Sequence, residues 1–172
     1  NFSAGPCILP KEVFKTCAEE MMDYNGTGLS VMEMSHRSSD YIDIANKARE
    51  DLIDLLNIPS NYQVLFLQGG ATLQFSMVPM NFGSQKVADY VLSGSWSKKA
   101  INEASKIIDI NIVTSSESSN FNHVSSEESW NCSEKASYLH YVANETIQGN
   151  ALHVPPTLDA PLISDMSSVI LS

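Results

Sequence analysis

Short apolar runs that alternate with glycine turns and helical patterns constrain this chain more than any other feature. The apolar run Val64–Leu67 leads directly into the turn Gln68-Gly69-Gly70-Ala71-Thr72, after which a helix is predicted to Asn81. The turn Gly94-Ser95-Trp96 opens another predicted helix. The predicted strands cover residues 64–67, 87–92, 107–113, 138–142 and 162–164, with a further strand beginning at 169. This alternation predicts an α/β fold, a mostly parallel sheet with flanking helices.

Two helices are predicted before the first of these strands. The first begins after Pro10 and ends at Asn25-Gly26, and the second follows Ser38-Ser39 and ends before Asn57. Residues 27–35 are predicted to form a loop between them. Residues 114–133 are rich in Ser, Asn and Glu and are predicted to be a solvated surface excursion.

Composition excludes several classes of function. The net charge is -10, with ten Lys and Arg scattered among twenty Asp and Glu, so no basic patch is expected for nucleic acid. No apolar stretch approaches the roughly 20 residues that cross a membrane. No basic leader precedes an apolar segment, so no secretory signal is expected. Cys7, Cys17 and Cys132 are odd in number and lack metal-site spacing, which favours a cytoplasmic protein with no metal.

The turn at Gly69-Gly70, the turn Gly94-Ser95-Trp96 and Asp165 lie where strands are predicted to end. Open α/β sheets bind ligands at these strand ends. The helix start at Ala71-Thr72 can bind an anion through free N–H groups, although a plain turn with a capping Thr is the alternative. Trp96 can stack on a flat ring or simply belong to the core. Asp165 can face a pyridine nitrogen or cap the next segment.

Two further segments carry candidate ligand contacts. Asn144-Glu145-Thr146 follows a predicted strand, and its Asn and Thr side chains suit hydrogen bonding there, with a simple turn as the alternative. Ser35-His36-Arg37 places two anion-binding side chains together, and Arg can grip a carboxylate or phosphate through two parallel hydrogen bonds. A solvated arginine beside a capping serine is the alternative.

Several phrases, in this order along the whole chain, resemble the phosphoserine aminotransferases. They are Asn1-Phe2-Ser3-Ala4-Gly5-Pro6, Met32-Glu33-Met34-Ser35-His36-Arg37, Gln68-Gly69-Gly70-Ala71-Thr72-Leu73-Gln74-Phe75, Ala88-Asp89-Tyr90, Gly94-Ser95-Trp96, Asn144-Glu145-Thr146-Ile147-Gln148-Gly149 and Ser164-Asp165-Met166-Ser167-Ser168. The resemblance implies the large domain of a type I transferase that depends on pyridoxal 5'-phosphate. Residues 1–172 would be its amino-terminal part, and the small domain would be absent.

The resemblance also implies an activity and a homodimer. An amino group would pass between L-glutamate and 3-phosphohydroxypyruvate, giving O-phospho-L-serine and 2-oxoglutarate in serine biosynthesis. It implies roles for single residues as well, with Asp165 and Trp96 acting in catalysis. The implied cofactor contacts are Ala71, Thr72, Trp96, Thr146 and Asp165, and the implied substrate contacts are Arg37 and His36.

The chain departs from the family pattern in two ways. Some relatives have Ser in place of Ala4 and Arg in place of Thr72, and the family's Schiff-base lysine is expected beyond Ser172. A piece without that lysine could be inactive and serve only in folding or dimerisation, which is the alternative function. A cysteine desulfurase is disfavoured because no cysteine lies in a nucleophile-like loop.

Overall fold

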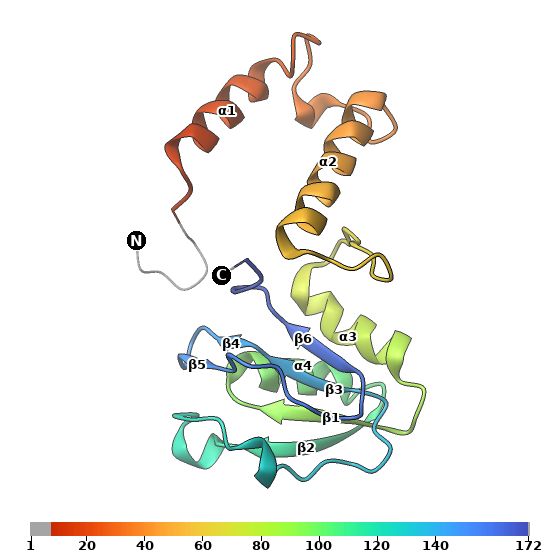
Figure 1. Ribbon diagram of the computed structural model, residues 1–172, viewed down its shortest axis with the longest axis vertical. Helices are drawn as coiled ribbons and strands as arrows, with labels where there is room; N and C mark the ends of the chain where they lie inside the picture. The colour runs from red at the N-terminus through yellow and green to blue at the C-terminus, as the bar shows by residue number, and fades with distance from the viewer. Residues whose placement is uncertain (1–7, 172) are drawn as a thin grey trace. The chain divides into compact units, whose positions relative to one another are not determined.

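The structure, a computed structural model, describes residues 8–171 (Figure 1). The chain divides into two compact units, Asn1–Phe66 and Leu67–Ser172, and each is considered by itself. The phrase Asn1–Pro6, with Ala4, and the adjacent Cys7 lie outside the described residues.

The first unit contains the two helices that are predicted before the first strand. Helix α1 spans Lys11–Met22 after Pro10, the 3-10 helix η1 spans Val31–Glu33, and α2 spans Ser39–Leu56. The Ser38 hydroxyl caps α2 by accepting a hydrogen bond from the Tyr41 N–H at 3.4 Å. Helix α1 ends three residues earlier than predicted.

The strand predicted at Val64–Leu67 is wrong. These residues form no ladder with any other described segment, and Leu65, Phe66 and Leu67 are all exposed. A strand is defined by hydrogen bonds to a neighbouring strand, so an apolar run without such a neighbour stays an irregular extended segment. The helix that follows it, α3, spans Gly70–Phe82 close to its predicted bounds.

The second unit is built on a four-stranded parallel sheet. Its strands are β1 (Val87–Leu92), β2 (Asp109–Ser115), β3 (Leu139–Val142) and β6 (Leu162–Asp165), in the order β2-β1-β3-β6. Strands β3 and β6 pair in a register that sets His140 against Ile163 and Val142 against Asp165. Strands β4 (Asn144–Glu145) and β5 (Asn150–Ala151) form a separate antiparallel pair. The predicted α/β class with a mostly parallel sheet is confirmed.

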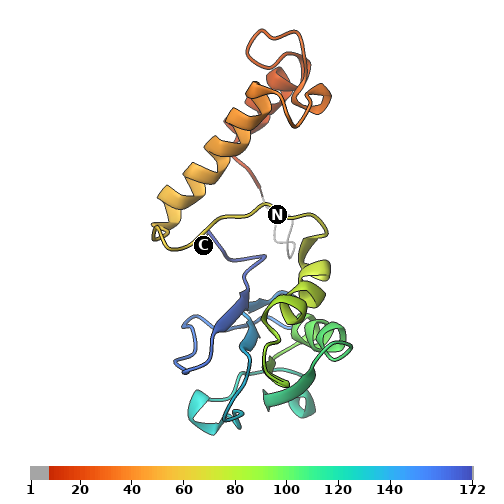
Figure 2. The ribbon, with the colours of Figure 1, turned by 90° about the vertical axis from the view of Figure 1, so that its right-hand side faces the viewer.

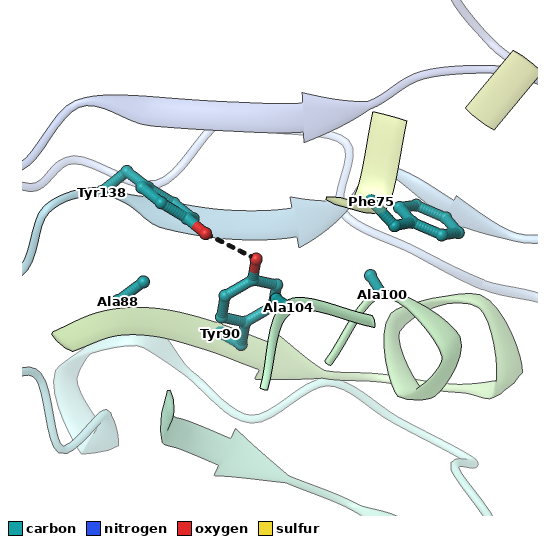
Figure 3. Close-up of a cluster of buried hydrophobic side chains, with 6 residues drawn as sticks. All are labelled: Phe75, Ala88, Tyr90, Ala100, Ala104 and Tyr138. Atoms are coloured by element: carbon teal, nitrogen blue, oxygen red, sulfur yellow. Dashed lines mark hydrogen bonds between the residues drawn. The ribbon is translucent and has the colours of Figure 1, made fainter. Parts of the chain in front are cut away.

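Helices α3 and α4 (Ser95–Ala104) cover one face of this sheet (Figure 2). Alternate residues of the strands meet them, and the resulting core contains Phe75, Ala100, Tyr90 and Tyr138 (Figure 3). The two tyrosine hydroxyls share a hydrogen bond of 2.8 Å. Burial raises the pKa of both tyrosines, so the pair stays neutral inside the core.

The opposite face of the sheet is covered by irregular chain. Val91, Leu139 and Tyr141 form a second buried cluster there, with Val124 and Trp130 packed against it. The prediction that residues 114–133 form a solvated excursion is therefore wrong in part. This segment, with 3-10 helices η2 (Glu117–Ser119) and η3 (Glu127–Ser129), shields a sheet face that no α-helix covers among the described residues.

The strand predicted to begin at residue 169 is also wrong. The segment after β6 turns instead, because the N–H groups of Val169 and Ile170 both donate to the carbonyl oxygen of Met166 at 3.0 Å. Within residues 8–171, no helix combines the length and the hydropathy required to cross a bilayer.

Candidate active site

A cavity of about 200 Å³ lies in the second unit where the parallel strands end. It is lined by all five residues predicted to contact a cofactor, Ala71, Thr72, Trp96, Thr146 and Asp165, together with Lys99. They come from the start of α3, the start of α4, the segment after β3 and the end of β6. Because parallel strands finish at one edge of a sheet, residues far apart in the sequence meet there.

The start of α3 lines this cavity with Ala71 and Thr72. Gly69 and Gly70 adopt φ angles of +95° and +58°, which only glycine tolerates readily, and they turn the chain sharply into the helix. The first intrahelical bond runs from the Leu73 N–H to the Gly69 carbonyl at 3.3 Å. The N–H groups of Ala71 and Thr72 therefore precede the helical ladder and can bind an anion, which the helix dipole favours.

Trp96 is held in place by Thr146, another of the predicted cofactor contacts. Its indole Nε1–H donates to Thr146 Oγ1 at 2.8 Å, so the ring is tethered at the rim of the cavity. The Thr146 hydroxyl accepts this bond and keeps its own proton free to donate. A ring of fixed orientation suits stacking on a flat ligand.

Glu145 positions this region and was missed by the sequence reasoning. Its side chain is completely buried and accepts hydrogen bonds from the N–H groups of Trp96 and Ser97, both at 2.8 Å. The carboxylate thus satisfies the first turn of α4, where a negative charge is most stable. The signal available was a carboxylate directly after a buried strand, which sequence alone assigns to the surface.

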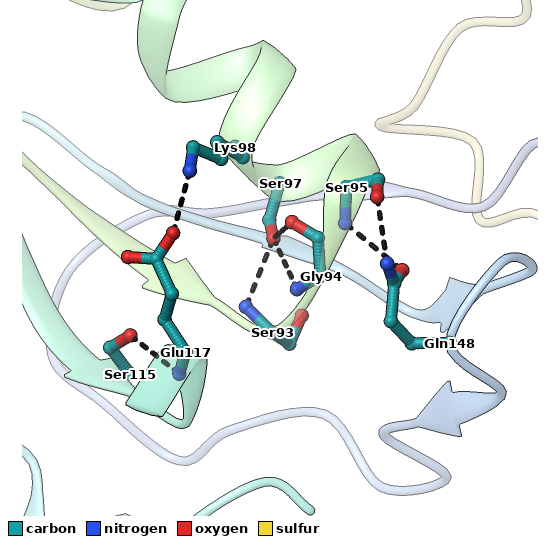
Figure 4. Close-up of polar contacts among 8 residues, drawn as sticks. All are labelled: Ser93, Gly94, Ser95, Ser97, Lys98, Ser115, Glu117 and Gln148. Atoms are coloured by element: carbon teal, nitrogen blue, oxygen red, sulfur yellow. Dashed lines mark hydrogen bonds and ion pairs between the residues drawn. The ribbon is translucent and has the colours of Figure 1, made fainter. Parts of the chain in front are cut away.

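Gln148 and Ser97 complete the start of α4 (Figure 4). The Gln148 side chain accepts from the Ser95 N–H at 3.0 Å and donates to the Ser95 hydroxyl at 2.7 Å. The Ser97 hydroxyl accepts from the N–H groups of Ser93 and Gly94, both at 2.9 Å. Glu145 and Gln148 therefore join the segment after β3 to the helix that carries Trp96.

Asp165 caps the next segment, which is one of the two alternatives considered for it. Its Oδ1 accepts from the N–H and the hydroxyl of Ser167 at 3.0 and 2.6 Å, which caps the turn after β6. Within the described part of the chain, Oδ2 accepts no hydrogen bond, so one carboxylate oxygen stays available to a ligand in the cavity.

His140 lies close to Asp165 without neutralising it. Both line a second cavity, which adjoins the first through Ala71, Phe75 and Asp165. Burial lowers the pKa of His140 to about 4, and the opposing effect of the Asp165 charge is smaller. The imidazole is therefore neutral near pH 7, and its stacked contact with Tyr90, 4.9 Å between ring centroids, fixes its plane.

His36 and Arg37 belong to the first unit. Both are exposed in the turn before α2, where the Arg37 N–H donates to the Ser35 hydroxyl at 3.2 Å. Their part in binding a substrate stays a prediction.

Comparison with known proteins gives a consistent picture. The family model for class-V aminotransferases matches residues 1–170. The phosphoserine aminotransferases of Pseudomonas entomophila and Acinetobacter baylyi are 52% and 50% identical to this chain, and each alignment covers 100% of it and 48% of the relative. The chain thus spans about half the length of these relatives.

Solved structures agree with the sequence relatives. Phosphoserine aminotransferase from Bacillus circulans subsp. alkalophilus superposes with a TM-score of 0.90 at 45% identity, over 96% of this chain and 46% of that one. The pyridoxal-phosphate-bound phosphoserine aminotransferase from Trichomonas vaginalis gives a TM-score of 0.91 at 41% identity, over 96% and 47%. The resemblance inferred from the sequence phrases is confirmed, and the chain belongs to the class-V aminotransferase family.

Proposed function

We propose that this chain is the amino-terminal part of the cofactor-binding large domain of a phosphoserine aminotransferase. The protein would transfer an amino group between L-glutamate and 3-phosphohydroxypyruvate, yielding O-phospho-L-serine and 2-oxoglutarate, in the cytoplasm and as a step of serine biosynthesis. The observation that carries the proposal is the shared cavity of Thr72, Trp96 and Asp165. The names of the sequence relatives and of the solved structures support it.

The cavity residues fit pyridoxal 5'-phosphate by their chemistry. Ala71 and Thr72 offer N–H groups and a hydroxyl to a phosphate, and tethered Trp96 offers a flat surface to an aromatic ring. Thr146 can donate its hydroxyl proton to a substituent of that ring. The free oxygen of Asp165 can accept a hydrogen bond from a protonated pyridine nitrogen.

Each of these residues then has a defined task. When bound, the cofactor supplies an aromatic ring that accepts electrons from the reacting carbon. Asp165 keeps the ring nitrogen protonated, and Trp96 holds the plane of the ring. Neutral His140 leaves the Asp165 charge uncompensated, so the carboxylate can act fully on the ring nitrogen.

Arg37, with His36 beside it, is the proposed contact for the anionic end of the substrate. No hydrogen bond or ion pair of the Arg37 side chain is found within residues 8–171, and the guanidinium is exposed. A guanidinium without a carboxylate partner is available to a carboxylate or phosphate of a ligand.

A homodimer is proposed from the surface of the first unit. Helices α1 and α2 have no buried residue, and apolar side chains such as Phe14, Met22 and Leu55 are exposed. Exposed apolar surface favours association with another protein surface. Analytical ultracentrifugation of the full-length protein should give twice the monomer mass, and a monomer at micromolar concentration would refute this part of the proposal.

The activity is tested with purified full-length protein, glutamate and 3-phosphohydroxypyruvate, by following the formation of 2-oxoglutarate. Asp165→Asn should lower kcat by about 100-fold or more, because the amide no longer stabilises positive charge on the ring nitrogen. The matched control is Asp159→Asn, which removes an exposed carboxylate that does not line the cavity. Absence of amino transfer by the unsubstituted protein would refute the proposed function, and undiminished kcat in Asp165→Asn would remove Asp165 from the site.

A further inference from the structure

Lys99 is a cavity residue to which the sequence phrases assign no role. It lies in the second turn of α4, and its Nζ donates to Thr72 Oγ1 at 3.0 Å, which links α4 to the first turn of α3. Its side chain lines the same cavity as Ala71, Trp96 and Asp165. The lysine therefore lies beside the N–H groups proposed to bind a phosphate.

The partner of Lys99 leaves its charge uncompensated. Lys98 and Lys106 donate to the carboxylates of Glu117 and Glu103, both at 2.6 Å, whereas Lys99 donates to a neutral hydroxyl. No carboxylate lies within ion-pair distance of Lys99 among the residues that the structure describes. The ammonium group has two further protons to donate, and the Thr72 hydroxyl still has its own.

The charges of the cavity complement a ligand with two unlike ends. Lys99 is the only cation and Asp165 the only carboxylate among the described residues that line it. They have different partners, Thr72 on α3 and Ser167 after β6. In a chain with a net charge of -10, a single unpaired lysine in the cavity supplies the local positive charge that a doubly charged anion requires.

We propose that Lys99 is a specificity-determining residue, which makes the cavity select the phosphorylated form of its ring ligand over the form that lacks phosphate. This inference rests on the proposed function and extends it. Lys99 donates a charge-assisted hydrogen bond to the phosphate alongside the Thr72 hydroxyl, and a ligand with a neutral hydroxymethyl group gains nothing from it.

The test compares two ligands that carry the same ring and the same aldehyde, pyridoxal 5'-phosphate and pyridoxal. Dissociation constants of the full-length apoprotein are measured for both by calorimetry, so any step common to the two aldehydes cancels in their ratio. Lys99→Met removes the charge and keeps the length of the side chain, and Lys99→Arg keeps the charge. The control, Lys98→Met, makes the same change one residue earlier, at a lysine that pairs with Glu117 and does not line the cavity (Figure 4).

We expect Lys99→Met to raise the dissociation constant of pyridoxal 5'-phosphate about tenfold or more, as for the loss of a hydrogen bond to a charged group. The dissociation constant of pyridoxal should change less than about threefold. Lys99→Arg should recover most of the loss, and Lys98→Met should match the unsubstituted protein. Equal weakening of both ligands, no weakening of either, or the same selective loss in Lys98→Met would overturn the inference.

Failure of the inference is distinguishable from failure of the proposed function. An unsubstituted protein that binds neither ligand refutes the proposed function and this inference with it. An unsubstituted protein that binds pyridoxal 5'-phosphate tightly, with Lys99→Met equally selective, refutes the inference alone.

Discussion

The buried carboxylate of Glu145 gives the sharpest stability prediction. It accepts two backbone hydrogen bonds of 2.8 Å, from Trp96 and Ser97, with no exposure to solvent. A hydrogen bond to a charged group contributes about 1.5–3 kcal/mol, so Glu145→Ala should lower the free energy of unfolding by roughly 3–6 kcal/mol. In Glu145→Gln one oxygen remains while the new NH₂ group faces an N–H donor, which should cost about 2–3 kcal/mol.

Urea unfolding of each variant measures these differences. With a denaturant slope of about 1–3 kcal/mol/M, a loss of about 2–3 kcal/mol moves the midpoint by roughly 0.7–3 M. The control is Glu117→Gln, because Glu117 pairs with Lys98 at the surface and an exposed ion pair contributes less than about 1 kcal/mol. If Glu145→Gln unfolds at the wild-type midpoint, or if Glu117→Gln loses as much as Glu145→Gln, the capping argument is refuted.

Gly94→Ala probes the same contact from the helix side. A Cβ at Gly94 would lie 2.7 Å from Glu145 Oε2 and 2.7 Å from Gln148 Oε1. The backbone there is extended, with φ of 172°, so alanine introduces no backbone strain and acts through this clash alone. We expect a loss of about 1–3 kcal/mol in the same urea experiment, and less in a Gly94→Ala/Glu145→Ala double variant than the sum of the single losses.

Three further measurements address the core and the substrate. Tyr138→Phe leaves the buried Tyr90 hydroxyl without a partner and should cost about 1–2 kcal/mol in urea unfolding, whereas the double change to Phe should cost less than the two single changes summed. His140 binds a proton in the unfolded state near pH 6.5 and in the folded state only near pH 4, so its stabilising effect falls as pH falls between these values. Between pH 7 and pH 4.5 this loss should reach about 2–3 kcal/mol, and His140→Asn should show a shallower pH dependence of unfolding or the assignment is wrong. Arg37→Ala should raise KM for the phosphorylated substrate tenfold or more while leaving the dissociation constant of the cofactor within about twofold, and equal losses would contradict the proposed contact.

The sequence predicted those elements whose bounds depend on nearby residues alone. Strand β1 occupies its predicted bounds, 87–92, because an apolar run ends at a Ser-Gly turn that a strand does not continue through. The run at 64–67 is entirely apolar, yet it pairs with no strand within residues 8–171, because pairing depends on distant parts of the chain. Likewise, the apolar residues of 114–133 are few, yet they cover a sheet face whose position the local pattern does not reveal.

The candidate site divides in the same way. The sequence could predict that Thr72, Trp96 and Asp165 lie close together, because each ends a strand or opens a helix at one edge of the sheet. Glu145 could not, since a carboxylate is usually exposed and its burial depends on N–H groups nearly fifty residues away. Lys99 could not either, because its contact joins two helices whose packing is set by the core.

The pairing of β3 with β6 has a consequence for how this region can vary. Val142 lies against Asp165, and neighbouring residues of a strand point to opposite faces of the sheet. A single residue inserted in β6 just before Ser164 would bring Ser164 to the level now occupied by the carboxylate and turn the acid towards the opposite face of the sheet. The connection between the two strands does not transmit this alternation of faces, but it carries Glu145, Thr146 and Gln148, so their contacts with α4 constrain it.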